Sequence, residues 1–329
     1  MKSKLYFRVD ANASIGRGHL SRCLALGEML KEEYDIFFVV LKVNQAYIEN
    51  LNINFSRKFV EDENGIFHFI NDKDFVWLDG YQFTEDYKKR LKSKVSKLIE
   101  TNDIPYEARN VDVIVNHTPG LEKKQFGKTT AQLYLGLKYA LLRPSFLDFA
   151  KKRQTNTPEG KGVFVCFGGA DIYNLGFKFV QRLVAENFTD PIYWIIQKDL
   201  NNNKLEDSSD NLQILSNLNE EDIIYYMLKS KVLLVPSSVL CFEAIALRKP
   251  FLASYFVENQ NLIFEGLKKA KLAECFGYME TGGDVDLAFD LFIQYYANDK
   301  RQKQIIINQK LALDGQSKTL VKSILKKAS

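Results

Sequence analysis

Short apolar runs alternate with stretches of helical period along most of the chain. In the first half, apolar runs at 5–9, 35–41, 75–78 and 111–115 predict buried strands, and residues 20–30 and 84–99 predict helices. The helix at 20–30 has apolar residues at 20, 23, 24, 26 and 30, which form one stripe. Strands that alternate with helices are typical of a parallel α/β sheet, whose ligands gather at the carboxyl ends of its strands.

The same alternation returns in the second half, after a break. Residues 151–162 are polar, rich in helix-breaking residues and without periodicity, as at a domain boundary. Beyond them we expect strands at 162–167, 192–196, 212–215, 232–236 and 251–256, with helices at 220–229, 239–247 and after 261. From 284 onward the chain is expected to be helical, with an interruption near 314–315.

This organisation predicts two Rossmann-like α/β domains with parallel sheets facing a cleft. We expect an N-terminal catalytic domain at 1–145, a linker at 146–161 and a second domain at 162–300. A C-terminal helical segment at 301–329 returns to the first domain in many two-domain proteins of this type, an expectation that rests on analogy.

Composition narrows the class of protein. The 329 residues are 46% hydrophobic and 26% charged, which is typical of a soluble globular protein. A net charge of +4, spread along the chain, argues against a nucleic-acid partner. The four cysteines lie far apart and fit reduced core thiols. No apolar run is long enough for a membrane span or a signal peptide, so we expect a cytoplasmic monomer.

One glycine loop follows the first strand of each half. Gly16 and Gly18 precede the helix at 20–30, and Gly168 and Gly169 follow the strand at 162–167. A glycine loop that opens a helix suits a phosphate, and two such loops suit a diphosphate, although a plain strand-to-helix turn is the alternative. Neither the dinucleotide fingerprint nor a Walker sequence is present, which disfavours NAD and ATP. We therefore expect no cofactor.

Candidate chemistry follows each loop. His19 is the only side chain in the first loop that exchanges a proton near neutral pH. Ser237 and Ser238 are placed to cap the helix at 239–247, and Glu243 on that helix suits the two hydroxyls of a ribose or, equally, a surface acid. Arg17 suits either a phosphate contact or an exposed position.

The sequence favours no metal site. Asp284 and Asp286 have D-x-D spacing, but they stand where a helix is expected to begin, so capping is the better interpretation. His19 and Cys23 share a helical face without a second pair of ligands. His117, after a strand, is a candidate for the cleft, whereas His68 is interpreted as structural.

A set of motifs in fixed order carries a resemblance to one family. Residues 236–250 resemble the small-residue, Glu, alanine-rich, Pro pattern of GT-B nucleotide-sugar glycosyltransferases. The full set is similar to the PseG family, the UDP-2,4-diacetamido-2,4,6-trideoxy-β-L-altropyranose hydrolases of pseudaminic acid biosynthesis. It comprises Arg8-Val-Asp10, Ile15-Gly-Arg-Gly-His19, Arg22-Cys23, Leu78-Asp79-Gly-Tyr81, Leu141-Leu-Arg143-Pro-Ser-Phe146, Phe167-Gly-Gly-Ala-Asp171, Ser237-Ser238 with Glu243, and Glu258-Asn-Gln260.

The resemblance implies a GT-B fold whose C-terminal domain holds UDP. It implies that His19 is the general base for a water that attacks the anomeric carbon with inversion, with Tyr81 and Asp10 as further catalytic residues. Substrate contacts are implied for Arg8, Gly16, Arg17, Gly18, Asn259 and Gln260. Nucleotide contacts are implied for Gly168, Gly169, Ala170, Asp171, Ser237, Ser238 and Glu243.

Three functions remain open at this point. The leading hypothesis is a metal-independent UDP-sugar hydrolase. A GT-B glycosyltransferase would pass the sugar to an acceptor hydroxyl with the same base and the same UDP site. A nucleotide-sugar binding protein without turnover is the third, and the placement of His19 beside two glycines argues against it. The sequence does not identify the sugar.

Overall fold

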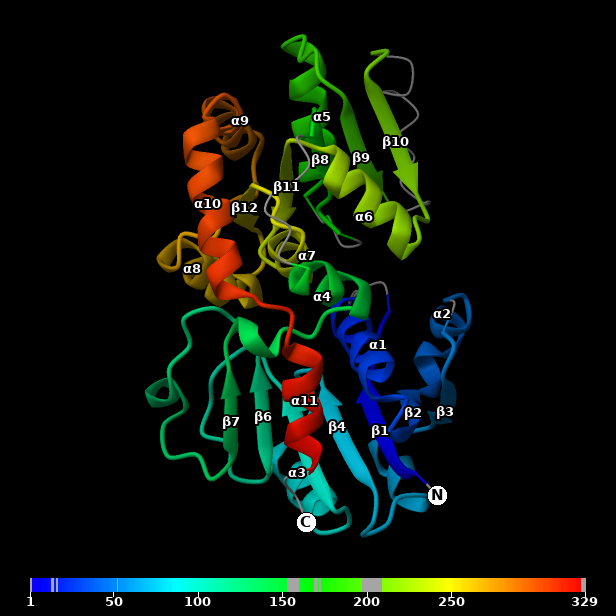
Figure 1. Cartoon of the computed structure of the whole chain (residues 1–329). Coiled ribbons are helices and arrows are strands. Elements are labelled where there is room, and N and C mark those ends of the chain that lie inside the picture. The colour runs from blue at the N-terminus through cyan, green and yellow to red at the C-terminus, as the bar shows by residue number, and fades with distance from the viewer. Residues whose placement is uncertain are drawn as a thin grey trace. The chain divides into compact units, whose positions relative to one another are not determined.

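The computed structural model describes residues 2–12, 15, 17–51, 53–152, 160–168, 171, 173–196 and 209–326. The chain divides into two compact units (Figure 1). Unit 1 comprises Met1–Leu147 with Gln316–Ser329, and unit 2 comprises Asp148–Gly315. The helix α4 (Pro144–Lys151) contains the boundary between them.

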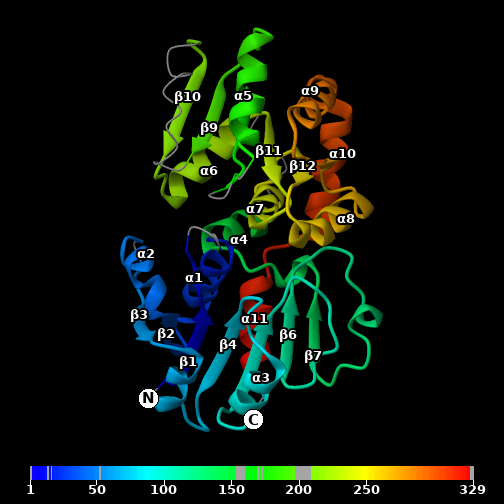
Figure 2. The same ribbon diagram turned by 180° about the vertical axis from the view of Figure 1, so that it is seen from behind.

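Unit 1 is built on a seven-stranded parallel sheet in the order β3-β2-β1-β4-β5-β6-β7. The strands β2, β4 and β6 are nearly continuous apolar runs, as expected of a sheet that helices cover on both faces. The helices α1 and α11 contact each other on one face, and α3 lies on the opposite face (Figures 1 and 2). The elements are β1 (Ser3–Val9), α1 (Gly18–Leu30), β2 (Tyr34–Leu41), α2 (Gln45–Glu49), β3 (Ser56–Val60), β4 (Phe75–Asp79), α3 (Glu85–Lys92), β5 (Lys97–Thr101), β6 (Val113–Asn116), β7 (Gln132–Leu135) and α11 (Ser317–Lys326).

The prediction of one helix over 84–99 is wrong in its second half. The helix α3 ends at Lys92, and Lys97–Thr101 forms β5, a fully buried strand in the middle of the sheet. Its two charged side chains have partners from distant parts of the chain. Lys97 Nζ donates to the carbonyl of Ile324 at 2.8 Å, and Glu100 lies 3.0 Å from Lys88 Nζ. These charges resemble an exposed helical face in the sequence, although tertiary contacts satisfy both of them.

Unit 2 contains a six-stranded parallel sheet in the order β10-β9-β8-β11-β12-β13. The helices α5 and α9 pack against one face around a core that includes Phe179, Leu234 and Phe292. The elements are β8 (Val163–Val165), α5 (Leu175–Ala185), β9 (Ile192–Ile196), β10 (Leu212–Ser216), α6 (Glu220–Lys229), β11 (Val232–Pro236), α7 (Val239–Ala246), β12 (Phe251–Tyr255), α8 (Asn261–Lys269), β13 (Glu274–Tyr278), α9 (Gly282–Tyr296) and α10 (Asp299–Ala312).

The prediction of two Rossmann-like α/β units with parallel sheets is confirmed. Helical structure after residue 284 is interrupted near 314–315, as expected, and also at 297–298 between α9 and α10. Asp284 closes a capping box with Thr281 at the start of α9, because its carboxylate accepts from the Thr281 N–H at 2.8 Å. Among the described residues, no helix is long and apolar enough to cross a membrane.

Candidate active site

His19 lies at the beginning of α1, at the carboxyl-end edge of the unit 1 sheet. Gly18 is the first residue of the helix, and Arg17 occupies the N-cap position without a side-chain capping hydrogen bond. The buried stripe of Leu20, Cys23 and Leu26 packs α1 against the sheet. This packing fixes the first turn of the helix and therefore the position of the His19 side chain, which is largely buried.

His19 forms a close pair with Asp79, the last residue of β4. The His19 Nδ1 atom lies 2.7 Å from Asp79 Oδ1, and Asp79 is completely buried. Burial by itself raises the pKa of this carboxyl, but the Arg22 and His19 side chains outweigh it, and the pKa of Asp79 lies below its usual range. An ionised carboxylate only accepts hydrogen bonds, so this contact favours a proton on Nδ1. In a neutral ring of that tautomer, the lone pair that accepts a proton lies on Nε2.

Arg22, one turn along α1, binds both oxygens of Asp79. Its Nε donates to Oδ2 at 2.5 Å and its Nη2 to Oδ1 at 2.7 Å. Its third nitrogen, Nη1, donates to Asp103 Oδ1 at 2.6 Å. Arg22 is almost fully buried, so the two carboxylates replace the water that its guanidinium would otherwise bind. They raise the pKa of Arg22 well above its ordinary value despite burial, which lowers it.

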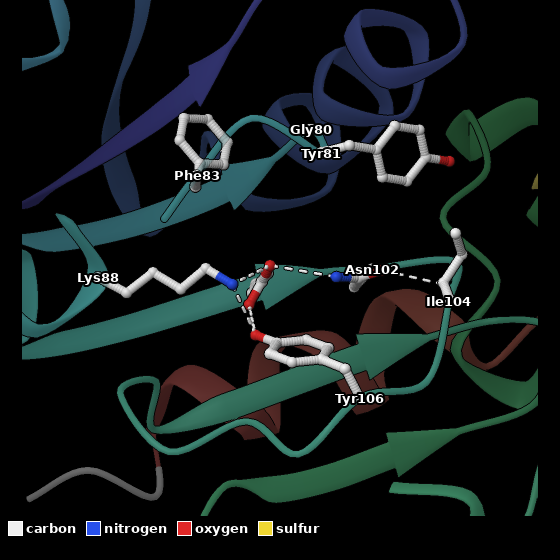
Figure 3. A pocket seen from close by; sticks show the side chains of 8 residues that line it. Gly80, Tyr81, Phe83, Lys88, Asn102, Ile104 and Tyr106 are labelled. Carbon is white, nitrogen blue, oxygen red and sulfur yellow. Dashed lines mark hydrogen bonds and ion pairs between the residues drawn. The ribbon is translucent and has the colours of Figure 1, made fainter. Parts of the chain in front are cut away.

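Tyr81 stands beside this cluster and is about half exposed (47%). Its hydroxyl donates to Asp103 Oδ2 at 2.7 Å, and its ring meets the His19 ring edge to face with centroids 4.9 Å apart. A pocket of about 260 Å³ adjoins Tyr81 (Figure 3). It is lined by Gly80, Tyr81, Phe83, Lys88, Glu100, Asn102, Ile104 and Tyr106. Tyr81 is thus the exposed member of the His19 cluster.

Arg8 and Asp10 belong to a separate, saturated network. Arg8 contacts Asp10 Oδ2 at 2.7 Å and forms a two-pronged ion pair with Glu63 at 2.8 and 3.1 Å. Asp10 also accepts from the Leu41 N–H at 2.9 Å and from Asn44 Nδ2 at 3.0 Å. These contacts join the ends of β1 and β2, so the structure places Arg8 and Asp10 in a buried support beneath the loop.

The opening loop itself is described in part. Gly16 lies outside the described residues. A Cβ at Gly18 would meet no atom of the described residues within 4 Å. Arg17 Nε donates to the Tyr47 hydroxyl at 3.0 Å, and its guanidinium lies over the Tyr47 ring. Arg17 is therefore held against α2 at the surface.

In unit 2, the loop after β8 has Gly168 in the left-handed region, with φ of +77°. Gly169 and Ala170 lie outside the described residues. Asp171 accepts from the N–H groups of Leu175 and Gly176, at 2.7 and 2.8 Å. These are N–H groups of the first turn of α5, so Asp171 occupies part of the anion-binding capacity of that helix end. Burial raises the pKa of Asp171.

The helix after β11 begins where the sequence predicted, but its cap differs. Ser238 is the N-cap of α7 and forms no side-chain capping hydrogen bond, so the predicted hydroxyl cap is not formed. The Ser237 hydroxyl is buried and has no hydrogen-bond partner among the residues that the structure describes. Glu243 lies in the middle of α7 and is almost fully buried, which removes the alternative of an exposed surface acid.

The segment after β12 contains Asn259 and Gln260 in a 3-10 turn at Glu258–Gln260. Gln260 Oε1 accepts from the Phe256 N–H at 3.2 Å, which closes this turn. Within the described part of the chain, no three His, Cys, Asp or Glu side chains are arranged to hold a metal ion. His117 lies buried near the Arg22 cluster, and its Nδ1 accepts from the Leu141 N–H at 3.2 Å.

The sequence alone did not identify Asp79, Arg22 and Asp103 as members of the site. Asp79 and Arg22 occur in the motifs but had no stated role, and a carboxylate directly after an apolar strand was the available signal. Asp103 was hidden because β5 was assigned to a helix, so its place after a strand end went unnoticed.

Two parallel α/β units of this kind define the GT-B architecture, and solved structures with this fold match almost the whole chain. MurG of Acinetobacter baumannii has a TM-score of 0.63 at 11% identity and covers 98% of this chain and 99% of its own. MnaA of S. aureus, solved with UDP, has a TM-score of 0.63 at 13% identity and covers 98% and 96%. At such low identity the match shows the fold alone.

A more specific similarity comes from the sequence. The chain is 26% identical over 271 residues to the UDP-2,4-diacetamido-2,4,6-trideoxy-beta-L-altropyranose hydrolase of Campylobacter jejuni subsp. jejuni. The match covers 78% of this chain and 93% of that protein. No family model matches the chain. The resemblance expected from the motifs is confirmed by this relative, whose sequence is covered over 93% of its length.

Proposed function

We propose that this protein is a hydrolase that releases UDP from a UDP-linked diacetamido-trideoxy-hexose. The observation that carries the proposal is the His19–Asp79 pair, at 2.7 Å, which leaves Nε2 of His19 as a proton acceptor. The similarity to the Campylobacter hydrolase supports the substrate class. The resemblance of the motifs to the PseG family is what suggests a place in pseudaminic acid biosynthesis. The proposed enzyme acts on a nucleotide sugar without a metal ion.

The proposed reaction is an inverting displacement at the anomeric carbon. Nε2 of His19 takes a proton from water as the water oxygen bonds to that carbon. The bond between the anomeric carbon and the β-phosphate oxygen breaks, and UDP leaves with the electron pair. Asp79 keeps the imidazole in the productive tautomer and stabilises the imidazolium that forms, as in other His–Asp pairs.

Unit 2 is proposed to hold the UDP group. Glu243 is expected to accept from the ribose hydroxyls, and Ser237 and Ser238 with Asn259 and Gln260 are expected to line the same site. Gly168, Gly169, Ala170 and Asp171 are expected around the diphosphate, where N–H donors stabilise the charge on the leaving group. The buried Ser237 hydroxyl, which has no partner among the described residues, is consistent with a ligand contact at this strand end.

In unit 1, Tyr81 is proposed to contact the substrate, because it is the exposed member of the His19 cluster. Gly16 and Gly18 are expected to leave room for the sugar at the helix start, with Arg17 at the rim. Arg8 and Asp10 act on the reaction through the backbone that they hold, since their polar atoms are engaged in the buried support.

The test is to incubate the protein with UDP-2,4-diacetamido-2,4,6-trideoxy-β-L-altropyranose and without any acceptor, with and without EDTA. We expect release of UDP and free sugar in both conditions, with inversion seen by early proton NMR. In water enriched in oxygen-18, the label should enter the sugar and not UDP. His19→Ala should lower kcat by ~10²–10⁴-fold, whereas His68→Ala, in the turn at Glu63–His68, should retain it.

The same experiment separates the alternatives. UDP release that requires an added sugar or alcohol acceptor would identify a transferase and contradict the hydrolase. Tight binding of the UDP-sugar with no release under any condition would favour a binding protein. Faster release from simple UDP-hexoses than from the diacetamido sugar would contradict the proposed substrate class.

A further inference from the structure

Asp103 is a buried carboxylate that lies two residues beyond the end of β5. Its exposed fraction is 7%, and it is held by a turn in which the Ile104 N–H donates to Asn102 Oδ1 at 2.9 Å. Asn116, at the end of the neighbouring strand β6, donates to the Asn102 carbonyl. The backbone around Asp103 is therefore anchored on two strands.

The two oxygens of Asp103 bind two different members of the His19 cluster. Oδ1 accepts from Arg22 Nη1 at 2.6 Å, and Oδ2 accepts from the Tyr81 hydroxyl at 2.7 Å. Arg22 in turn holds Asp79, and Asp79 holds His19. Asp103 thus connects the exposed tyrosine to the histidine without itself touching the imidazole.

The Arg22 guanidinium has a choice of acceptors that bears on the tautomer of His19. Its Nη2 lies 2.7 Å from Asp79 Oδ1 and 3.0 Å from His19 Nδ1. If Nη2 donates to Asp79, Nδ1 keeps its proton and Nε2 remains a base. If Nη2 donates to Nδ1, that nitrogen must be bare, the proton sits on Nε2, and the imidazole cannot take a proton from water.

The position of Asp103 favours the productive choice. The hydrogen bond that Asp103 accepts from Nη1 orients the planar guanidinium so that Nε and Nη2 face the two oxygens of Asp79. Asp103 also sets the charge of the cluster. Arg22 carries one positive charge, and Asp79 and Asp103 carry one negative charge each, so these three side chains place one net negative charge beside the imidazole. That charge stabilises the imidazolium which forms during proton transfer.

We propose that Asp103 is a positioning residue that orients Arg22 and Tyr81 and thereby keeps His19 in the tautomer with the proton on Nδ1. The catalytic part of this inference rests on the proposed hydrolase function, whereas the tautomer itself can be measured without any substrate. Asp103→Asn is the direct test, because it removes the charge and preserves the shape of the side chain.

The chain contains three histidines, so long-range proton–nitrogen NMR of nitrogen-15 histidine gives three ring patterns, and His19→Ala assigns the one of interest. In the unsubstituted protein without substrate, we expect His19 to show a protonated Nδ1. In Asp103→Asn, we expect a large part of the signal to move to the tautomer with a protonated Nε2. Hydrolysis should fall ~10–100-fold in kcat, with KM changed less than ~3-fold.

Glu100→Gln is the matched control. Glu100 is a buried carboxylate on β5, three residues before Asp103, and it pairs with Lys88 and Tyr106 instead of Arg22. The Glu100→Gln variant should lose stability as Asp103→Asn does, because each removes a buried carboxylate from its ion pair. It should leave the His19 tautomer unchanged. If Asp103→Asn does not fold, Arg22→Lys serves as the second variant, because a lysine cannot bridge both carboxylates with a planar fork.

An unchanged His19 tautomer in Asp103→Asn, or in Arg22→Lys, would overturn the proposal. An equal change in Glu100→Gln would overturn it too, because the effect would then reflect general loosening. A tautomer change in a protein that hydrolyses no UDP-sugar would support the positioning role and refute the hydrolase, so the two failures can be told apart.

Discussion

Arg248 connects three helix ends in unit 2, and its replacement tests how much one buried guanidinium contributes to that unit. It is 6% exposed, and its Nη1 donates to the carbonyls of Ile245 and Gln309 at 3.1 and 2.9 Å. Its Nη2 donates to Ala150 and Leu313 at 3.3 and 2.5 Å. These carbonyls lie at the carboxyl ends of α7, α10 and α4, which carry partial negative charge. Those of Ile245 and Gln309 also accept a backbone N–H.

The expected loss can be worked out from these contacts. Removal of the guanidinium leaves up to four carbonyls without that donor, each at a cost of ~1 kcal/mol or more. Burial of the positive charge is itself unfavourable and lowers the pKa of Arg248 to about 10, so it offsets part of the stability that these hydrogen bonds contribute. We therefore expect Arg248→Met to lower the free energy of unfolding by ~3 kcal/mol. Arg248→Lys should lie between this variant and the unsubstituted protein, because an ammonium reaches fewer carbonyls.

The backbone at Arg248 offers an internal comparison. Its φ is +58°, in the left-handed region that glycine adopts without strain. Arg248→Gly and Arg248→Ala both lose the guanidinium, but only alanine keeps the strained Cβ, so the glycine variant should be more stable by ~1 kcal/mol. Urea unfolding followed by circular dichroism measures all four variants. A loss below ~1 kcal/mol in Arg248→Met, or equal stability of the alanine and glycine variants, would refute this reasoning.

Two other predictions concern acid stability and backbone crowding. Burial lowers the pKa of His117 to about 4 from 6.5, so the unfolded chain binds the proton first as pH falls; the free energy of unfolding should drop by up to ~3 kcal/mol between pH ~6.5 and ~4. Urea titrations at several pH values should show a flatter profile for His117→Gln, and an unchanged slope would count against this assignment. A Cβ at Gly162, where φ is +85°, would lie 2.0 Å from the Pro191 carbonyl oxygen, whereas at Gly136, where φ is +92°, it would meet nothing within 4 Å. Gly162→Ala should therefore cost more than ~3 kcal/mol and Gly136→Ala ~1 kcal/mol; similar thermal midpoints for both variants would contradict the crowding argument.

The fold class could be predicted from the sequence because buried parallel strands consist largely of consecutive apolar residues. The strands β2, β4, β9, β11 and β12 and the helix α6 lie where the pattern placed them. It failed where long-range partners decide the structure. Lys97 was assigned to the lysine-rich helix predicted at 84–99, yet it lies in a sheet, where the Ile324 carbonyl accepts from it. Lys88 likewise pairs with the buried Glu100 of the same strand. The strands β3, β7 and β13 were not predicted because they begin with polar residues or contain a glycine and so show no long apolar run.

The candidate site was predictable in part for a similar reason. His19 and Tyr81 could be named from motifs, because they stand in a glycine loop and after a strand. The network that connects them could not, since Arg22 and Asp103 are separated by 81 residues and meet only after β5 takes its place beside β4. A charged residue is most often exposed, so the burial of three charged side chains in one cluster can be recognised only from the three-dimensional structure.

The turn after β4 brings together three side chains that are close in sequence but bind different partners. Asp79 holds His19, Tyr81 binds Asp103, and Gln82 Nε2 donates to Asp10 Oδ2 at 3.3 Å. Gly80 leaves room for this arrangement, because a Cβ there would lie 2.4 Å from Gln82 Oε1 and would push that side chain from Asp10.

One short turn thus joins the buried support formed by Arg8 and Asp10 to the cluster around His19. The buried support fixes the end of β1, which precedes α1 in the chain. The turn after β4 fixes Asp79, the carboxylate that His19 of α1 contacts. Arg8 and Asp10 are therefore expected to influence the position of His19 through the backbone. Substitutions at Asp10 and at Asp79 should for this reason differ in kind, since the first displaces His19 and the second changes its tautomer.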